Sequence, residues 1–537
     1  MPDIQMERKS RRDFLHLAGA GITGATLSSA TAFAGPPQRG SAGSGPGRPI
    51  FDVKNFGAKG DGVAVDTPAV NKAIDAAATA GGGTVHFPAG TYKCFTIHLK
   101  SKVSLYLDMG ATILAGETGS EGQYDAAEPN QWDKFQDYGH SHWHNSLILG
   151  EGIENFSIVG PGLIWGKGLS RGTRDAPKAE DPGVGNKAIA LKNCRNVILR
   201  DFSILHGGHF GILATGVDNF TIDNLLIDTN RDGIDLDCCH NVRVSNCSVN
   251  SPYDDGICPK SSFALGYARP TENVTITNCF VSGYLEGSLL DGTFKRTPPR
   301  ANFSPTGRIK FGTESNGGFK NITVSNCVFD FCRGLALESV DGALLEDITI
   351  SNITMRDISN APIFMRLGAR MRGPEGVPVG KLRRVIISNI VCSNAVSRLG
   401  SIISGIPGHE IEDVRLSDIY IQHQGGGTPA DAQIQPLEKE DAYPEPVMFG
   451  PILPSHGFFI RHARNIRLSD VEIAYLQEDA RPVFVLQNVT GADFFRVKAQ
   501  HAAIAPTFAL RQVQDFSVAQ SRPIPETLIE RADDKKL

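Results

Sequence analysis

Five aspartates lie close together in the segment NRDGIDLDCCHNVRVSNCSVNSPYDDGICPKS, which spans residues 230–261. They are Asp232, Asp235, Asp237, Asp254 and Asp255. The flanking residues alternate between apolar and polar types, as in a half-buried strand. Carboxylates crowded into such a place repel one another and lose hydration, which raises the pKa of at least one of them. Such a group can supply an acid and a base, or it can bind a hard cation such as calcium.

A short phrase that recurs along the chain indicates how these aspartates are positioned. Each copy has a polar pair, then alternating apolar and polar residues, then Asn or Asp, and the copies at residues 195, 218 and 240 are 23 and 22 residues apart. One strand per repeat of this length predicts a solenoid, and the strand-rich content predicts an all-β, right-handed parallel β-helix. The copies are ENFSIVG (154), RNVILRD (195), DNFTIDN (218), HNVRVSN (240), ENVTITN (272), KNITVSN (320), EDITISN (346), RRVIISN (383), EDVRLSD (412) and RNIRLSD (464).

The ends of this solenoid are predicted from their composition. Residues 67–82 have helical apolar spacing and end at glycines, so we expect an N-terminal helix that caps the β-helix. The β-helix domain is predicted to span residues 50–520. Residues 521–537 are charged, and we expect them to form a loose C-terminal tail.

The length of one coil should bring distant aspartates together. Asp232 and Asp254 are 22 residues apart, so they should lie on the same side of the solenoid, one strand spacing of about 4.8 Å apart, with Asp255 beside them. We expect Asp235 and Asp237 to orient this group or to cap the turn. Three interpretations remain open here, namely an acid/base set for glycoside hydrolysis, a calcium site, and a solvated acidic turn.

The aspartate motifs also resemble a known family. NRDGIDLDCC and YDDGICPKS are similar to the two aspartate motifs of family 28 glycoside hydrolases, the polygalacturonase family, and FGTESNGGFKNITVSNCVF is similar to the segment that follows them. The resemblance covers roughly residues 50–480, although the opening FDVKNFGAKGDG is shared with pectin lyases. It implies that Asp254 is the general acid and that Asp232 and Asp255 activate water, giving inversion without a metal or cofactor.

Two motifs of the family pattern are changed. Thr306 stands where the resemblance places a histidine, and Ala336 and Glu338 stand where it places the arginine and lysine that hold a galacturonate carboxylate. A literal Arg308-Ile309-Lys310 occurs upstream, and we interpret it as a coincidence. Loss of a charged clamp and a repulsive Glu338 argue against unmodified galacturonate at the cleavage subsite. A neutral sugar such as rhamnose or galactose, or a galacturonate held from another side, fits better.

Other polar side chains are expected near the aspartates. His206 and His209 could bind sugar hydroxyls, and Lys260 could neutralise the carboxylates. An arginine-containing loop at 366–372 could bind an acidic polymer. For each of these, the alternative is a structural residue at a bend or a solvated side chain. For YGHSHWHNS, residues 138–146, we favour a sugar-stacking wall that includes Trp143 over a metal site, since no acidic or cysteine partner is near in sequence. The candidates for substrate binding are His206, His209, Lys260, Glu314, Glu338 and Arg366.

The N-terminus indicates export. Arg11 and Arg12 precede an apolar Gly/Ala-rich run that closes with Ala-Phe-Ala, so residues 1–34 resemble a twin-arginine signal peptide and 35–49 a linker. This predicts a periplasmic or secreted protein with no membrane association after cleavage. The net charge of −5, with no basic stretch, argues against nucleic acid as a partner. The cysteines that follow asparagine in the repeats are expected to be buried and unpaired.

These observations predict an exported, monomeric glycoside hydrolase. We expect it to cleave O-glycosidic bonds in pectin-type polysaccharide, either galacturonan or rhamnogalacturonan oligosaccharides, with inversion and from a chain end. One alternative is a calcium-dependent polysaccharide lyase on the same fold. Another is a β-helix that binds carbohydrate without catalysis.

Overall fold

The computed structural model describes residues 49–137, 139–171, 181–297 and 304–537. The predicted signal peptide and residues 35–48 of the predicted linker lie outside the described residues, so both stay predictions. Within the described ranges, no helix is long and apolar enough to cross a membrane.

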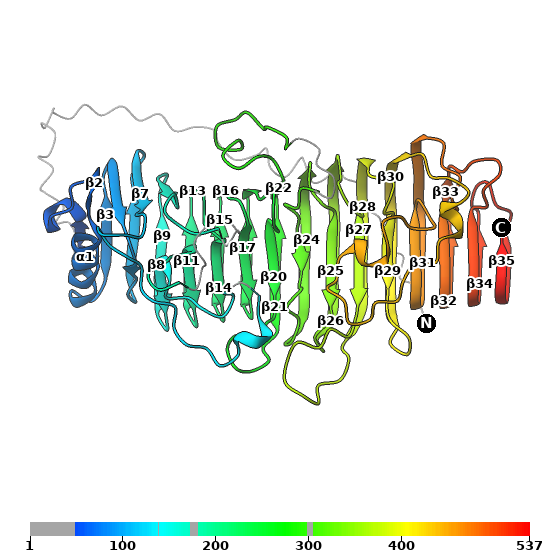
Figure 1. Cartoon of the computed structure of the whole chain (residues 1–537), viewed down its shortest axis with the longest axis horizontal. Helices are drawn as coiled ribbons and strands as arrows, with labels where there is room; N and C mark the ends of the chain where they lie inside the picture. The colour runs from blue at the N-terminus through cyan, green and yellow to red at the C-terminus, as the bar shows by residue number, and fades with distance from the viewer. Residues whose placement is uncertain (1–48, 138, 172–180, 298–303) are drawn as a thin grey trace, which may run out of the picture. The chain divides into compact units, whose positions relative to one another are not determined.

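The described chain is a parallel β-helix, as predicted (Figure 1). The ten copies of the repeated phrase are strands that stack in parallel and in chain order, with Val197 level with Phe220, and Phe220 level with Val242. Each coil therefore places its strands directly on those of the coil before. These strands are β9 (Glu154–Val159), β12 (Arg195–Arg200), β15 (Asp218–Asp223), β18 (His240–Ser245), β21 (Thr271–Thr277), β24 (Phe319–Asp330), β26 (Leu344–Arg356), β28 (Lys381–Ala395), β30 (Ile411–Gly425) and β31 (Phe458–Gln477).

A second stack of strands carries the aspartate motifs. All residues of β14 and β17 are buried. The core covers the inner face of this stack, and loops cover its outer face. The stack continues through an isolated bridge between Ile257 and Ile309. Its strands are β5 (Ile97–His98), β8 (Ser146–Glu151), β11 (Lys187–Lys192), β14 (Phe210–Thr215), β17 (Asp232–Asp237), β20 (Ile257–Lys260), β23 (Lys310–Phe311), β25 (Leu335–Ser339), β27 (Ile363–Leu367) and β29 (Ser401–Ser404).

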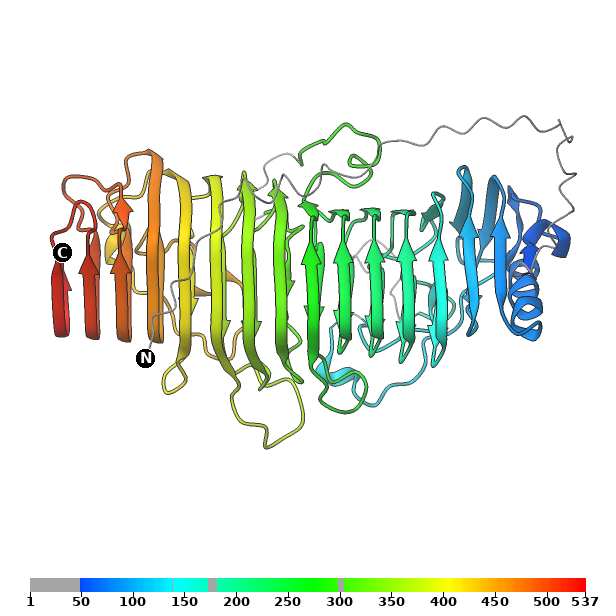
Figure 2. The same ribbon diagram turned by 180° about the vertical axis from the view of Figure 1, so that it is seen from behind.

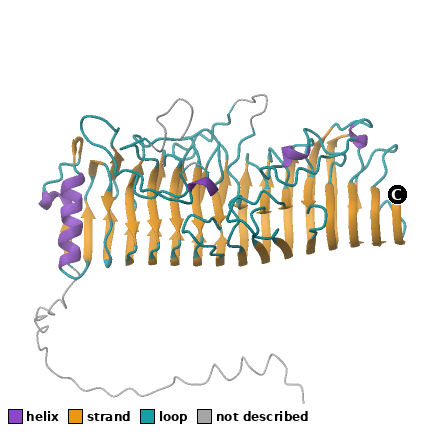
Figure 3. Cartoon of the chain, turned by 60° about the horizontal axis from the view of Figure 1, so that its bottom comes forward, coloured by secondary structure: helices purple, strands orange, loops and turns teal. Residues whose placement is uncertain are grey.

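Shorter strands complete the coils, and most loops lie to one side of the strands (Figure 3). Four 3-10 turns interrupt the loops of the described chain. The remaining elements are β1 (Ile50–Asp52), β2 (Asp61–Val65), β3 (Gly83–Phe87), β4 (Gly90–Cys94), β6 (Val103–Leu107), β7 (Ala111–Ala115), β10 (Leu163–Trp165), β13 (Ser203–Leu205), β16 (Leu226–Asp228), β19 (Ser248–Asn250), β22 (Phe280–Ser282), β32 (Phe484–Phe495), β33 (Lys498–Ala499), η1 (Val53–Phe56), η2 (Asp133–Phe135), η3 (Asp431–Gln433) and η4 (Pro446–Phe449).

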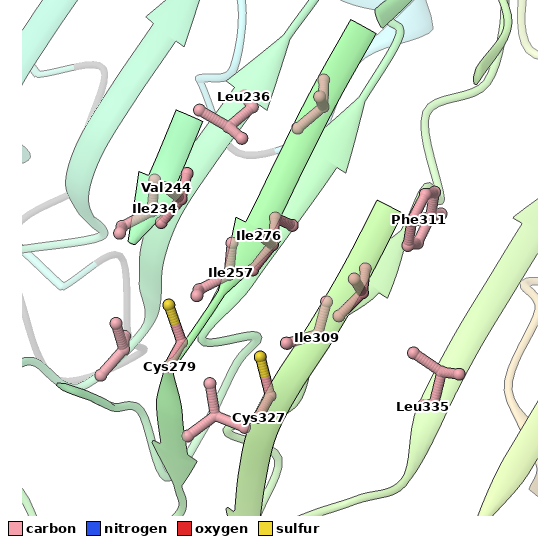
Figure 4. Close-up of a cluster of buried hydrophobic side chains, with 14 of the residues drawn as sticks. Ile234, Leu236, Val244, Ile257, Ile276, Cys279, Ile309, Phe311, Cys327 and Leu335 are labelled. Atoms are coloured by element: carbon pink, nitrogen blue, oxygen red, sulfur yellow. The ribbon is translucent and has the colours of Figure 1, made fainter. Parts of the chain in front are cut away.

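The core is a continuous column of aliphatic and aromatic side chains inside the coils. Ile234 and Leu236 of the aspartate strand point into it, beside Ile257 and stacked Cys279 and Cys327 (Figure 4). The ten cysteines are buried and free, as expected for those in the repeats. Outside the core, asparagines at the bends form a ladder of side-chain hydrogen bonds, for example from Asn219 to Asn196 at 2.9 Å. These asparagines have a positive φ, which asparagine tolerates better than most residues.

The two ends of the β-helix are closed in different ways. Helix α1 (Thr67–Thr79) buries Val70 and Ile74 at the N-terminal end, as predicted. At the other end, the expected loose tail is wrong, because residues in this region form β35 (Thr527–Lys536), which pairs antiparallel with β34 (Phe508–Ala519) (Figure 2). The physical reason is that an open last strand needs a hydrogen-bonding partner and a cover for its apolar face.

We predict that β35 contributes to stability through its inner face. Ile529 is 8% exposed and Leu528 is 87% exposed, although they are neighbours on one strand. Ile529→Ala should lower the free energy of unfolding by about 2–3 kcal/mol, near the lower end for buried aliphatic truncations. Leu528→Ala should change it by less than about 0.5 kcal/mol. Chemical unfolding of both variants checks this, and equal effects would mean that the strand does not pack.

Candidate active site

The register between β17 and β20 decides which aspartates face each other. Ile234 is level with Ile257, and the amide of Gly233 donates to the carbonyl of Asp255 at 2.9 Å. The offset is therefore 23 residues, so Asp232 lies level with Asp255. Asp232 and Asp254 lie beside each other as expected, with oxygens within 4.8 Å, but they are displaced from direct register by one residue. The cause is one extra residue in bend 251–256, since seven positions separate Asn250 from Ile257 and six separate Asp228 from Ile234.

The three predicted catalytic aspartates nevertheless converge. One oxygen of Asp232, one of Asp254 and one ring nitrogen of His209 all lie within 4.8 Å of one another. Asp232 and Asp255 are 2% and 1% exposed, whereas the side chain of Asp254 is 23% exposed. Asp254 is therefore the member of the group that a substrate in solution can reach.

The environment of Asp254 keeps its carboxyl group protonated in a fraction of the molecules near neutral pH. Burial and the nearby negative charge of Asp232 raise the pKa of Asp254 to about 6. The guanidinium of Arg231, which donates to Asp254 at 2.6 Å, acts in the opposite direction. A carboxyl with a pKa near 6 is suited to donate a proton in this pH range.

Asp255 has the opposite environment. Burial disfavours its charge, but Lys310 and Arg308 outweigh burial and hold the pKa of Asp255 well below its usual range. The Arg308 Nε donates to Asp255 Oδ1 at 2.9 Å, and the Lys310 ammonium contacts Oδ2. Both cations of Arg308-Ile309-Lys310 therefore bind Asp255, and the interpretation that the triplet is a coincidence rather than a relocated motif stays a prediction.

Asp232 lies beside a lysine that offsets its charge. Lys260 Nζ lies 4.0 Å from Asp232 and 3.5 Å from Asp235, which agrees with its expected neutralising role. The ammonium also lies 3.0 Å from His140 Nε2. Among the described residues, Asp232 Oδ1 has no hydrogen-bond partner. It is a buried acceptor that a bound water molecule could satisfy.

The remaining two aspartates of the motif support the structure around the group. Asp237 accepts hydrogen bonds from the Ser262 amide at 2.7 Å and from its hydroxyl at 2.6 Å, so it caps the turn. Asp235 is fully buried beside Lys260 and His140, and burial raises its pKa. Both positions fit the expectation that these residues orient the site or cap the turn.

Three of the substrate-binding candidates lie beside the aspartates. His209 is buried against Asp232 and Asp254, and burial lowers its pKa, so its ring is neutral. Glu314 is buried and accepts from Lys260 at 3.4 Å, so it supports the lysine. Glu338 is fully buried 3.9 Å from Arg308, and burial raises its pKa to about 8, so it is largely protonated at neutral pH. The expected charge repulsion by Glu338 is thereby weakened.

Other candidates lie elsewhere. His206 accepts a hydrogen bond from Trp165 at 3.1 Å on the neighbouring strand stack. Arg366 is buried, and its guanidinium donates to backbone carbonyls of Gly405, Glu438 and Lys439 rather than to the aspartate group. The predicted sugar-stacking wall is wrong, because Trp143 is 0% exposed and donates to Thr215.

The sequence reasoning missed residues that come from distant loops. His140 was considered only as part of a histidine cluster, but His142 and His144 turn to other partners, Asp133 and Glu151. Glu445, on the segment 426–457 that connects β30 to β31, accepts from Arg308 at 2.5 Å. The motif Tyr-Pro-Glu-Pro at 443–446, with an acid between two prolines, was the available signal.

Comparison with known proteins agrees with this geometry. Residues 50–258 match the family model described as rhamnogalacturonase A/epimerase, pectate lyase-like. The chain is 26% identical over 291 residues to exo-poly-α-D-galacturonosidase of Dickeya chrysanthemi, covering 43% of this chain and 45% of that protein. It is 32% identical over 192 residues to plasmin and fibronectin-binding protein A of Streptococcus pneumoniae, covering 32% of this chain and 23% of that protein. Neither relative is matched over half of its own length.

A solved structure resembles the whole arrangement of coils. The family 28 exopolygalacturonase of Yersinia enterocolitica has a TM-score of 0.60 at 19% identity, with 83% of this chain and 78% of that chain covered. At this identity the likeness shows the fold. Together with the matches above, it supports the resemblance to family 28 glycoside hydrolases.

We predict that Arg308 is a main electrostatic support of the site. Arg308→Met leaves Asp255 with one of its two cations and removes a buried partner of Glu445. The free energy of unfolding at pH 7 should fall by about 3–5 kcal/mol, as when one member of a buried ion pair is lost. Arg243→Met, which removes a charge from the outer face of β18, should cost less than about 0.5 kcal/mol. Chemical unfolding measures both, and equal losses would contradict this role.

Proposed function

We propose that this protein is an inverting glycoside hydrolase that cleaves O-glycosidic bonds in pectin-type oligosaccharides or polysaccharides. The observation that carries the proposal is the pairing of Asp254, partly exposed and with a pKa of about 6, with a buried Asp232, one oxygen of which has no hydrogen-bond partner among the described residues. An acid and a water-orienting carboxylate at one cleft are the parts that this reaction requires.

The reaction assigns one step to each aspartate. Asp254 protonates the leaving glycosidic oxygen while the bond from that oxygen to the anomeric carbon breaks. Water held on Asp232 Oδ1 attacks the anomeric carbon and gives its proton to Asp232. Asp255 stays ionised beside Lys310 and Arg308, and its negative charge favours the positive charge that develops on the sugar ring.

The spacing of the carboxylates makes retention a second candidate. Oxygens of Asp232 and Asp254 within 4.8 Å are closer than the about 6.5–9.5 Å that is typical of inverting enzymes and nearer to the about 5–5.5 Å of retaining ones. In a retaining reaction, Asp232 would attack the sugar directly. We favour inversion on the resemblance to family 28. Proton NMR of the first anomer released distinguishes the two, because retention preserves the anomeric configuration of the substrate.

A neutral sugar at the cleavage subsite is our preferred substrate. Lys310 is paired with Asp255, and Arg308 with both Asp255 and Glu445, so neither cation offers a free contact to a substrate carboxylate in place of the clamp that Ala336 and Glu338 lack. Segment 426–457 folds back to the site at Glu445, which supports action from a chain end. We further propose that the protein is exported as a monomer, on the basis of its N-terminal sequence and composition.

The two other interpretations make different predictions. A calcium-dependent lyase would form an unsaturated, ultraviolet-absorbing product and stop when calcium is chelated. The contacts of Arg231 with Asp254 and of Lys260 with Asp232 weigh against a calcium ion, because their positive charges already offset the carboxylates. A non-catalytic β-helix would bind carbohydrate without forming reducing ends.

We predict that Asp254→Asn lowers kcat by about 10²–10⁴, the usual contribution of a general acid, with substrate binding retained. Product analysis on homogalacturonan and on rhamnogalacturonan oligosaccharides, scored by new reducing ends, measures it. Asp223→Asn is the matched control. Asp223 lies on β15, in the strand stack that carries the repeated phrase and not the aspartate motifs, so this variant should keep full activity. Unchanged hydrolysis in Asp254→Asn would overturn the mechanism.

We also predict the direction of the pH dependence. Asp254 must be protonated to act, so kcat/KM should fall as the pH rises above about 6. Arg231→Gln removes a positive charge that favours the ionised carboxylate, so it should raise the pKa of Asp254 and move this limb to higher pH. The pH profile of kcat/KM checks the shift, with Arg243→Gln as the control. A shift to lower pH would show that another group sets this limb.

A further inference from the structure

Segment 426–457 places an acidic side chain beside the aspartates from far along the chain. The segment leaves β30 and returns to β31, and in the orange part of Figure 1 it crosses the coils of β25 to β29. Glu445 lies at its inner point, between two buried prolines, Pro444 and Pro446. Proline fixes its own φ and restricts the residue before it to extended conformations. Pro444 and Pro446 therefore limit the backbone conformations available at Glu445.

Two guanidinium groups converge on the Glu445 carboxylate. Arg308 donates to Oε1 at 2.5 Å and Arg333 donates to the same oxygen at 2.8 Å. Asn360 Nδ2 lies 3.5 Å from Oε2. These cations, Arg308 first, hold the pKa of Glu445 below its usual range although burial acts against them. Paired guanidinium groups are a typical binding site for a carboxylate.

The segment is anchored firmly on both sides of Glu445. Arg461 donates to the carbonyls of Pro436 and Leu437 at 3.0 and 2.8 Å. The buried Arg366 donates to the carbonyls of the next two residues, Glu438 and Lys439. On the other side, Phe449 and Leu453 are buried in a small apolar cluster. The Glu445 carboxylate is therefore a permanent occupant of the arginine pair.

The arginine pair lies next to the proposed cleavage site and is open to solvent at one end. Arg308 contacts Asp255 through Nε and Glu445 through Nη2, so one guanidinium separates the two carboxylates. The side chains of Arg333 and Glu445 are 23% and 17% exposed, whereas Arg308 is 2% exposed. A sugar ring in the cleft could thus reach Arg333 if Glu445 were absent.

We infer that Glu445 is a specificity-determining residue: its carboxylate occupies a two-arginine subsite that would otherwise bind the carboxylate of a uronate, and so excludes uronates in favour of neutral sugars. The inference rests on the proposed function only in taking this cleft as the sugar-binding site. It also gives a use for the buried Arg366 and Arg461, which hold the segment in place.

Equilibrium binding of free sugars tests this inference without any turnover. We expect Glu445→Ala to bind galacturonate about ten- to a hundredfold more tightly than the unchanged protein, because the truncation vacates the subsite and Arg333 gains a charged partner from solution. Galactose, which has the same ring stereochemistry and no carboxylate, should bind equally to both proteins. Isothermal titration calorimetry at low salt measures all four affinities.

Three further variants make the result specific. Glu440→Ala removes the same side chain from an exposed position on the same segment and should leave both affinities unchanged. Adding Arg333→Gln to Glu445→Ala should abolish the gain for galacturonate. If Glu445→Ala does not fold, Glu445→Asp withdraws the carboxylate by one methylene and should give a smaller gain in the same direction.

The inference is overturned if galacturonate affinity does not rise in a folded Glu445 variant, or if galactose affinity rises equally. Failure of this binding result leaves the hydrolysis proposal intact, because no bond is cleaved in the measurement. Conversely, if the unchanged protein hydrolysed no substrate, a measured gain in galacturonate affinity would still support the inference about Glu445.

Discussion

The parallel stacking of coils, one strand spacing of about 4.8 Å apart, is the constraint on which this site depends. Backbone hydrogen bonds fix the height of every residue relative to the coil below, so a single extra residue in bend 251–256 decides that Asp255, not Asp254, lies level with Asp232. Asp254 is displaced toward solvent as a result. The same offset places Arg231 level with Asp254, where the two form an ion pair.

Burial makes charge compensation necessary throughout this region. The outer face of the aspartate strands is covered by loops, so each carboxylate needs a partner or must take up a proton. Asp255 has Arg308 and Lys310, whereas Asp254 and Glu338 have raised pKa values. The site therefore holds carboxyl groups of different protonation within a short distance, which is the property that acid/base chemistry uses.

Distant segments complete the site that the repeats begin. Arg308 lies on the coil that follows the double-aspartate motif, and Glu445 comes from a segment more than a hundred residues later. His140 comes from the loop that precedes β8. None of these residues belongs to the repeated phrase. They set the charge around an aspartate group that the repeats position.

The sequence by itself determined the coil architecture, the N-terminal cap and the convergence of the three aspartates, because period-two alternation and a repeat of 22 or 23 residues leave few other folds. It did not determine the register of Asp232, the use of Arg308 and Lys310, the burial of Trp143 or the pairing of β35. Those depend on a bend one residue longer and on loops whose paths have no periodic signal. Only the tertiary structure decided them, because contacts between residues far apart in the chain form when whole coils stack.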